Sequence, residues 1–336
     1  MTRRNREIRL ARRPQGRPRV EDFTLAETEL AEPGPGEVLV RNLVVSVDPG
    51  QRGLMDGGES YVASYRLGQA LTGRSVGRVI ALNAAALPEG TLVFHRLGWR
   101  ELAVLPAAAA RPLPPAADPA DHLDILGHPG LTAWLGVGEV LGIGGGEVVL
   151  VSSAAGAVGG AAGQLARLRG AKRVIGTTGS EAKTAHLRDT LGFDVALNHR
   201  APDFAAQLAA AAPEGIDAFF DNVGGAQLEI ALPLMRQHGR IAICGAIATY
   251  NDAVPRPLAG FDAVLRQRLR VQGFLVYDHE DRMPAFLAEM QPLLAAGRIM
   301  APKTVYEGLE AVPAALVALF EGTTLGKTLV RLAADG

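Results

Sequence analysis

The amino-acid sequence predicts an α/β fold that combines a doubly wound parallel sheet with a second, β-rich domain. Residues 1–125 hold many short β-branched runs between Gly and Pro turns, whereas residues 125–300 alternate apolar runs with segments of helical period. Regular alternation of strand and helix is typical of a parallel sheet with helices on its faces. We therefore expect a β-rich, partly open barrel from residues 1–124 and 301–336, and a dinucleotide-binding domain from residues 125–300.

The composition is that of an ordinary folded chain. Of the 336 residues, 48% are hydrophobic and 40 are Gly, and the formal net charge is -1. These values give no sign of disorder or of a surface that binds nucleic acid. The longest apolar stretches are interrupted well short of a membrane span, and the basic N-terminal region lacks the apolar centre of a secretory signal. We expect a cytoplasmic protein that binds neither nucleic acid nor membrane.

A bound metal is not expected. The single cysteine, Cys244, excludes an intramolecular disulfide and any zinc site built from several thiolates. The histidines are scattered without the spacing of metal ligands. Cys244 is interpreted as a small buried hydrophobic residue, and the protein is predicted to be zinc-independent.

The β-rich domain begins with an arginine-rich region over residues 3–19, which we interpret as a solvated edge strand. Alternating and β-branched apolar runs then indicate four strands. They cover residues 37–47, 73–82, 91–95 and 99–104. The proline-rich passage over residues 107–119 is typical of a rigid linker and ends near Asp121. Residues 303–331 predict a helix and a last strand that return to this domain.

The second domain opens with the strand, Gly-rich turn and helix of a βαβ unit. The apolar run 148–151 predicts a strand buried on both faces, and residues 157–168 keep a helical period. Between them, Ala154-x-Gly156-x-x-Gly159 has the spacing of a dinucleotide-binding turn, with Ala154 in place of the first glycine. Gly156 lets the backbone approach a pyrophosphate, and Gly159 lets the helix pack closely on the sheet. The N–H groups at the start of this helix also favour an anion.

The alternation continues to residue 276. Strands are predicted over residues 173–178, 193–197, 216–221, 240–244 and 271–276, and helices over residues 204–212 and 227–237. Ligands of a doubly wound sheet bind beyond the carboxyl ends of its strands. Those ends carry residues 222–225, residues 245–247 and Tyr277.

The residues after the strand over 173–178 indicate the type of cofactor. An NAD site usually carries an acidic residue there, which accepts hydrogen bonds from the ribose hydroxyls. Here the neutral residues 177–180 fill this place, and the ammonium of Lys183 follows one turn later. This combination suits a 2′-phosphate and favours NADP(H). Glu181 leaves NAD(H) as the alternative, because a longer loop could return its carboxylate to the ribose.

These motifs resemble the medium-chain dehydrogenase/reductase superfamily, in particular its zinc-free branch of NADPH-dependent alkenal/one reductases. This branch includes the prostaglandin reductases, plant double-bond reductases and bacterial curcumin reductases. The likeness spans nearly the whole chain and rests on motifs at residues 46–53, 126–134, 154–159, 179–183, 220–225, 243–251, 273–277 and 325–327. It implies a Rossmann domain and a GroES-like domain of partly open barrel form.

The resemblance also implies the roles of individual residues. Tyr250 is the catalytic candidate, because the family places a tyrosine beside the substrate carbonyl; the alternative is a surface-loop aromatic. The cofactor-binding candidates fall into groups by the part of the cofactor they would contact. They are Gly156, Ala157 and Val158 for the pyrophosphate, Gly179, Ser180 and Lys183 for the 2′-phosphate, Thr132, Asn222, Cys244, Phe274, Leu275 and Val276 for the nicotinamide end, and, without an assigned part, Val223, Gly245, His199 and Thr324.

Three departures from the family pattern leave some of these contacts open. Gly50 and Gln51 stand where the family usually has Tyr-Met, so an aromatic residue that lines the pocket is missing. His199 replaces a tyrosine, which is expected to alter stacking or a phosphate contact. Thr324 replaces an asparagine, which leaves that cofactor contact open.

The activity implied by the resemblance is reduction of the C=C bond of α,β-unsaturated ketones or aldehydes. The hydride goes from NADPH to the β-carbon, and the Tyr250 hydroxyl serves as oxyanion partner or proton donor. Tyr61 and Tyr65 are candidates for covering the substrate from a mobile loop. The natural enone or enal is not indicated, because such pockets are mostly apolar. Two alternatives stay open: a quinone reductase on the same scaffold, and a non-catalytic NADPH-binding protein.

A homodimer is also expected. Residues 272–277 come late in the wound sheet, where an edge strand exposes unpaired backbone groups that can pair with another chain. Family members commonly join their sheets at this place.

Overall fold

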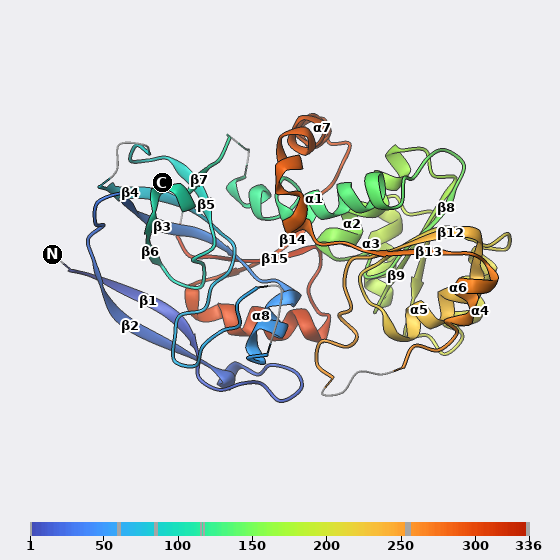
Figure 1. Ribbon diagram of the computed structural model, residues 1–336, viewed down its shortest axis with the longest axis horizontal. Coiled ribbons are helices and arrows are strands. Elements are labelled where there is room, and N and C mark those ends of the chain that lie inside the picture. The colour runs from blue at the N-terminus through green and yellow to red at the C-terminus, as the bar shows by residue number, and fades with distance from the viewer. Residues whose placement is uncertain are drawn as a thin grey trace. The chain divides into compact units, whose positions relative to one another are not determined.

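The computed structural model describes residues 2–58, 62–83, 87–114, 116, 118–252 and 257–333. The chain forms two compact units, which Figure 1 shows. The first unit comprises Met1–Leu123, Lys303–Thr324 and Thr328–Gly336, and the second comprises Asp124–Pro302 and Leu325–Lys327. Each unit has its own sheet.

The second unit is built on a six-stranded parallel sheet with the order β10-β9-β8-β11-β12-β13. The strands are β8 (Val148–Val151), β9 (Arg173–Thr178), β10 (Val195–Asn198), β11 (Ile216–Asp221), β12 (Met235–Ile243) and β13 (Arg270–Gly273). The chain enters at β8, runs outward through β9 and β10, and returns to β11 on the other side of β8. The strand order therefore reverses between β8 and β11, and the carboxyl ends of these two strands are where such sheets bind ligands.

Helices pack on both faces of this sheet. They are α1 (His128–Leu135), α2 (Ala157–Leu168), α3 (Glu181–Asp189), α4 (Phe204–Ala211), α5 (Gly225–Ala231), α6 (Asp262–Arg266) and α7 (Met283–Ala295). On one face, Leu150 and Phe219 join a core cluster with residues of α4 and α5. The next residue of β11, Phe220, points to the opposite face, where its ring meets the edge of Phe274 with centroids 6.2 Å apart. A Cβ on Gly136 would lie 2.3 Å from the Phe220 ring, so this packing requires glycine.

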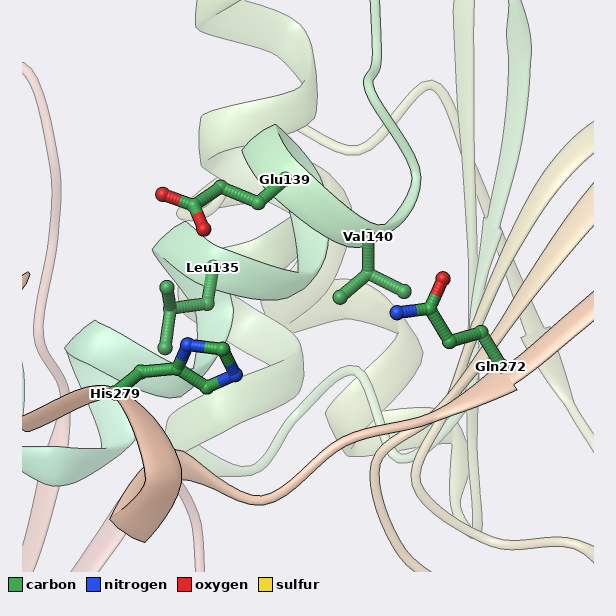
Figure 2. A pocket seen from close by; sticks show the side chains of 5 residues that line it. All are labelled: Leu135, Glu139, Val140, Gln272 and His279. Carbon is green, nitrogen blue, oxygen red and sulfur yellow. The ribbon is translucent and has the colours of Figure 1, made fainter.

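A pocket of about 210 Å³ opens at the edge of this sheet, beside the turn of π-helix Gly136–Val140 that follows α1 (Figure 2). It is lined by Leu135, Glu139, Val140, Gln272 and His279. None of the candidate site residues lines this pocket, so it does not belong to the candidate site.

The predicted parallel sheet is confirmed, and several element boundaries are corrected. The helix expected over residues 227–237 ends at Ala231, because Pro233 cannot donate the next helical hydrogen bond, and β12 starts at Met235. The strand expected over residues 271–276 ends at Gly273, and Val276 begins a 3-10 turn, Val276–Arg282.

The first unit contains a seven-stranded sheet with the order β14-β15-β3-β4-β5-β7, and β6 pairs with β3. Its strands are β3 (Glu37–Ser46), β4 (Ser75–Leu82), β5 (Leu92–His95), β6 (Leu102–Pro106), β7 (Arg111–Pro112), β14 (Lys303–Glu307) and β15 (Lys327–Arg331), and helix α8 covers Val312–Glu321. In the described residues this sheet stays open rather than closing into a barrel. The passage over residues 107–119 is not a free linker, because β7 pairs with β5.

The arginine-rich N-terminal region forms β1 (Thr2–Leu10), which pairs with β2 (Phe23–Ala31) in a two-stranded antiparallel sheet. Several of its arginines are held in ion pairs. Arg3 pairs with Glu32 at 3.0 Å, and Arg12 pairs with Asp22 at 2.6 Å. Local carboxylates therefore neutralise part of this positive charge, in keeping with a surface strand.

Two residues of the first unit that were singled out from the sequence, Gln51 and Tyr65, are buried. Gln51 is buried: its Oε1 atom accepts the N–H of Asp48 at 2.8 Å, and its Nε2 atom donates to the backbone oxygen of Thr72 at 3.4 Å. Tyr65 is buried as well, and its hydroxyl donates to the same Thr72 oxygen at 2.6 Å. Tyr65 is therefore a core residue rather than a mobile cover, while Tyr61 lies outside the described residues.

His95 in β5 predicts a loss of stability in acid. The side chain is buried, and burial, followed by the charge of Arg100, lowers the pKa of His95 to about 3. In the unfolded chain the pKa is about 6.5, so below that pH only the unfolded state takes up this proton. The free energy of unfolding should therefore fall by about 1.4 kcal/mol per pH unit from this residue, between about pH 6 and about pH 4.

Urea unfolding curves at several pH values for the natural protein and His95→Gln would check this prediction. The variant should lose stability less steeply in acid, because glutamine can accept the hydrogen bond from the Leu97 N–H without titrating. Equal slopes for the two proteins would show that His95 is not the titrating group.

Candidate active site

The Gly-rich turn after β8 is shaped to let a ligand approach the start of α2. Gly156 is the N-terminal cap residue of α2, and no side chain caps the helix. A Cβ on Gly159 would lie 2.4 Å from the backbone oxygen of Ser153, so only glycine lets α2 sit this close to the turn. The first N–H groups of the helix, from Ala157 and Val158 onward, therefore face the turn without a side-chain acceptor, which is the usual arrangement for a phosphate.

Ala154 replaces the first glycine of the dinucleotide-binding turn, and Gly176 on the next strand makes room for it. Ala154 is buried, and its N–H donates to the Thr177 oxygen at 2.9 Å. A Cβ on Gly176 would lie 2.9 Å from the Ala154 methyl group, so Gly176 makes the room that Ala154 needs. Behind the turn, the Gly326 N–H donates to the Ala155 oxygen at 2.8 Å.

A buried carboxylate fixes the loops at the carboxyl ends of β8 and β11. Asp221 ends β11, and its carboxylate accepts from the Ser152 hydroxyl at 2.7 Å and from the N–H groups of Val223 at 2.9 Å and Gly224 at 3.1 Å. Burial raises the pKa of Asp221, and these hydrogen bonds act in the opposite direction. Gly224 has a φ of 67°, which glycine adopts without strain. Removing the Asp221 carboxylate would leave several buried donors without an acceptor.

The same network orients Asn222. Its N–H donates to the Ser152 hydroxyl at 2.8 Å, and its Nδ2 atom donates to the Ser152 backbone oxygen at 2.8 Å. The amide is thus held in one orientation. Ser152 and Asp221 were not predicted as site residues. The sequence feature that could have identified them is a polar residue at the carboxyl end of each of two buried apolar strands.

Tyr250 returns to this loop from the end of β12. The Cys244 N–H donates to the backbone oxygen of Asp221 at 2.8 Å, and this bond holds the end of β12 beside β11. The Tyr250 hydroxyl accepts the N–H of Ala246 at 3.3 Å. A Cβ on Gly245 would lie 3.2 Å from both the Tyr250 hydroxyl and the Asn222 backbone oxygen. The structure thus brings together Tyr250, Gly245 and Asn222, three residues that are distant from the Gly-rich turn in sequence.

The protonation states of Tyr250 and Cys244 are set by burial. Burial raises the pKa of Tyr250, with a smaller opposing effect of the hydrogen bond from Ala246. The phenol is therefore protonated at neutral pH, and no described residue accepts its proton. Burial, followed by the charge of Asp221, raises the pKa of Cys244 to about 12. Cys244 is therefore a neutral thiol and not a nucleophile.

The remaining candidates for the nicotinamide end each make separate contacts in the structure. The Thr132 hydroxyl in α1 donates to the His128 oxygen at 2.7 Å. Phe274 packs on Phe220, Leu275 is 37% exposed, and Val276 is buried. The hydrogen bonds and ring contacts of the described chain do not join Thr132, Leu275 or Val276 to Tyr250. Thr324 belongs to the first unit.

The candidates for the 2′-phosphate gather at the ends of β9 and β10. Gly179 follows β9, Ser180 is the N-terminal cap residue of α3, and Lys183 lies in the first turn of α3. A Cβ on Gly179 would lie 3.4 Å from the Nε2 atom of His199, the residue after β10. The carboxylate of Glu181, the alternative ribose acceptor, accepts from the Asn198 amide at 2.9 Å.

Two family models match the chain. One, described as the N-terminal domain of oxidoreductase, covers residues 6–113, and the other, described as zinc-binding dehydrogenase, covers residues 157–291. The NADPH-dependent curcumin reductase of Escherichia coli (strain K12) is 36% identical, over 99% of this chain and 98% of that protein. Prostaglandin reductase 1 of Rattus norvegicus is 39% identical, over 94% of this chain and 96% of that protein.

The chain belongs to the medium-chain dehydrogenase/reductase family. The crystal structure of CurA from Vibrio vulnificus superimposes with a TM-score of 0.94 at 35% identity, covering 99% of this chain and 100% of that one. The same protein in complex with NADPH gives a TM-score of 0.93 at 34% identity, covering 98% and 99%. The predicted family and fold class are therefore confirmed.

The name of one family model mentions zinc, which makes the possible metal ligands among the described residues relevant. Within the described residues, no group of three His, Cys, Asp or Glu side chains could hold a metal ion.

Among the helices in the described part of the chain, none is long and apolar enough to cross a membrane.

Proposed function

We propose that the protein reduces the C=C bond of α,β-unsaturated ketones or aldehydes with NADPH. The observation that carries this proposal is a tyrosine hydroxyl, protonated at neutral pH, held beside the Asn222–Gly245 backbone at the point where the strand order reverses. The names of the relatives support the substrate class: curcumin reductase, prostaglandin reductase and, at 35% identity, the NADP(+)-dependent 2-alkenal reductase of Nicotiana tabacum.

The residues present fit a dinucleotide. Gly156 and Gly159 leave the start of α2 open for the pyrophosphate. Lys183, in the helix that follows the neighbouring strand β9, is available for the 2′-phosphate. Asn222 and Gly245 lie with Tyr250 at the end proposed for the nicotinamide. When bound, NADPH supplies the hydride that reduces the β-carbon.

Tyr250 is proposed to donate a hydrogen bond to the carbonyl oxygen of the substrate. Negative charge grows on this oxygen as the double bond is reduced, and a fixed O–H donor stabilises it. The Ala246 N–H, which donates to the Tyr250 oxygen at 3.3 Å, holds that oxygen in place and leaves its proton for the substrate. Asp221 acts as a positioning residue, because it holds the backbone of the loop over residues 222–224.

Consumption of NADPH with a panel of enones, enals and benzoquinones tests the proposal. We expect steady consumption with an α,β-unsaturated ketone or aldehyde, and a saturated carbonyl product. Reduction of benzoquinone alone would identify a quinone reductase instead. Tight binding of NADPH without consumption by any acceptor would indicate a non-catalytic binding protein.

The enzyme is predicted to keep full activity after dialysis against a strong chelator. Its proposed chemistry needs no Lewis acid, because the tyrosine hydroxyl bonds the carbonyl oxygen. Enone reduction measured before and after dialysis checks this. A loss of activity that zinc restores, and magnesium does not, would contradict it.

We further propose that the working form is a cytoplasmic homodimer. Strand β13 lies at the edge of the parallel sheet, and all four of its residues, Arg270–Gly273, are exposed. Large apolar side chains nearby in sequence are also exposed: Val271 by 42%, Phe261 by 61% and Leu265 by 80%. An uncovered edge strand that carries an exposed apolar side chain favours pairing with a second copy.

Light scattering at micromolar concentration should give the mass of two chains. Val271→Lys places a charge on the proposed edge and should shift the protein toward monomer. A charge at Leu25, which is exposed to a similar extent on β2 of the first unit, should not. A natural protein that is monomeric would contradict the proposal.

A further inference from the structure

We propose that Arg200 and His199 complete, with Lys183, a subsite for the 2′-phosphate of the cofactor, and that protonation of His199 sets how strongly the subsite selects the phosphorylated form. This inference rests on the proposed function, since it concerns the cofactor of that reaction. Arg200 is absent from the residues predicted from the sequence.

The sheet register brings these side chains to the open face of Gly179. Strands β9 and β10 run parallel with Asn198 opposite Thr178, and the His199 N–H donates to the Thr178 oxygen at 2.9 Å. A Cβ on Gly179 would lie 3.4 Å from the His199 Nε2 atom, 3.4 Å from the Arg200 Nε atom and 3.5 Å from the Arg200 Cζ atom. Because residue 179 is glycine, the two basic side chains flank a space that no side chain fills.

The cations at this place lack an internal partner. Lys183 is half-buried in the first turn of α3, and no described carboxylate forms an ion pair with Lys183 or Arg200. Burial, and then the charge of Arg200, lowers the pKa of Lys183, so Arg200 disfavours the charged form of Lys183. An anion bound beside both cations would favour their charged forms and would be stabilised by them.

The nearby carboxylates of the described chain bond neutral donors and form no ion pair with Lys183 or Arg200. The Glu181 carboxylate accepts from the Asn198 amide at 2.9 Å and the Thr184 hydroxyl at 3.4 Å. Asp203 accepts from Gln207 at 2.8 Å. A ligand phosphate can therefore supply the anion, and the neighbouring Gly-rich turn indicates a dinucleotide rather than free phosphate.

His199 makes the subsite sensitive to pH. Burial, and then the charge of Arg200, lowers the pKa of His199, so the imidazole is neutral in the free protein at neutral pH. A phosphate dianion acts in the opposite sense and raises the pKa of the ring. Binding of the phosphate therefore takes up a proton, and lower pH strengthens it. Arg200 opposes the protonation of His199, and the Glu181 carboxylate of α3 accepts from the amide of Asn198, the residue before His199.

Calorimetric titration of the full-length protein with adenosine 2′,5′-bisphosphate and with 5′-AMP tests the role of Arg200. Arg200→Gln should bind the bisphosphate about tenfold more weakly, with 5′-AMP unchanged, because an exposed charge-assisted contact lies at the lower end of its usual range. Arg200→Lys should lose less. Arg188→Gln is the matched control, since Arg188 is exposed in the last turn of α3 and its loss changes the net charge equally.

His199→Gln tests the pH dependence. Between about pH 8 and about pH 6, the preference for the bisphosphate over 5′-AMP should rise more steeply in the natural protein than in the variant. Titration in two buffers of different ionisation enthalpy should show proton uptake that the variant lacks. The phosphate of the free ligand titrates near pH 6 alike in both experiments, so the difference between the proteins reports the coupled titration of His199 and the bound phosphate.

The outcomes separate this inference from the proposed function. A preference for the bisphosphate that neither Arg200→Gln nor His199→Gln changes would overturn the inference and leave the reductase proposal intact. An equal loss for both ligands in Arg200→Gln would also overturn it, because the side chain would then act on adenosine binding as a whole. If neither nucleotide binds the natural protein, both proposals fail.

Discussion

Lys183→Ala is expected to weaken NADPH binding about ten- to a hundredfold while NADH binding hardly changes. A hydrogen bond to a charged group contributes about 1.5–3 kcal/mol, and the half-buried position of Lys183 limits screening by solvent. NADH lacks the 2′-phosphate, so it gains nothing from this ammonium. The dissociation constants of both cofactors, measured by quenching of protein fluorescence, give the comparison directly.

Lys183→Met separates charge from packing in the same experiment. Methionine keeps most of the aliphatic stem and removes only the ammonium, so it should lose NADPH affinity as alanine does. Lys172→Ala is the control, because Lys172 is exposed and makes only a loose pair with Glu214 at 3.9 Å. Equal losses for NADPH and NADH, or a natural preference for NADH, would refute the assignment of the 2′-phosphate to Lys183.

The opening βαβ unit could be predicted because its signals are local. The strand over residues 148–151 is apolar and β-branched, and helix α2 covers Ala157–Leu168 as expected. Gly170, with a φ of 90°, takes the left-handed conformation that lets the chain leave the helix. Each of these features depends on residues within a few positions, so the sequence alone is sufficient.

The contacts that shape the candidate site depend on distant parts of the chain, and these could not be predicted. Ser152 and Asp221 are 69 positions apart, and only the pairing of β8 with β11 brings the hydroxyl within 2.7 Å of the carboxylate. Arg200 reaches Gly179 only through the register of β9 and β10. The prediction for Tyr65 was wrong for the same reason. Tyr65 was expected to cover the substrate from a mobile loop, but tertiary packing buries its ring in the first unit.

Tyr250→Phe is expected to lower kcat for enone reduction by about 10²-fold, with NADPH binding nearly unchanged. The substitution keeps the ring and removes the phenol hydroxyl that the structure holds beside Gly245 and the Asn222 backbone oxygen. The loss belongs to the transition state, because the carbonyl oxygen becomes a strong acceptor only as negative charge grows on it. A ribose hydroxyl of the cofactor could act as a second donor, which places the effect at the low end of the range for general acid catalysis.

Single-turnover rates with several enones measure the chemical step itself and so avoid a limit set by product release. Tyr306→Phe is the matched control, since it removes a tyrosine hydroxyl from β14, outside the candidate site residues. Because burial raises the pKa of Tyr250, the natural enzyme should keep its rate up to about pH 10, the reference pKa of a phenol, whereas the slow variant should show no alkaline loss from this group. Unaltered single-turnover rates in Tyr250→Phe would make Tyr250 a loop aromatic and assign stabilisation of the carbonyl oxygen to another donor.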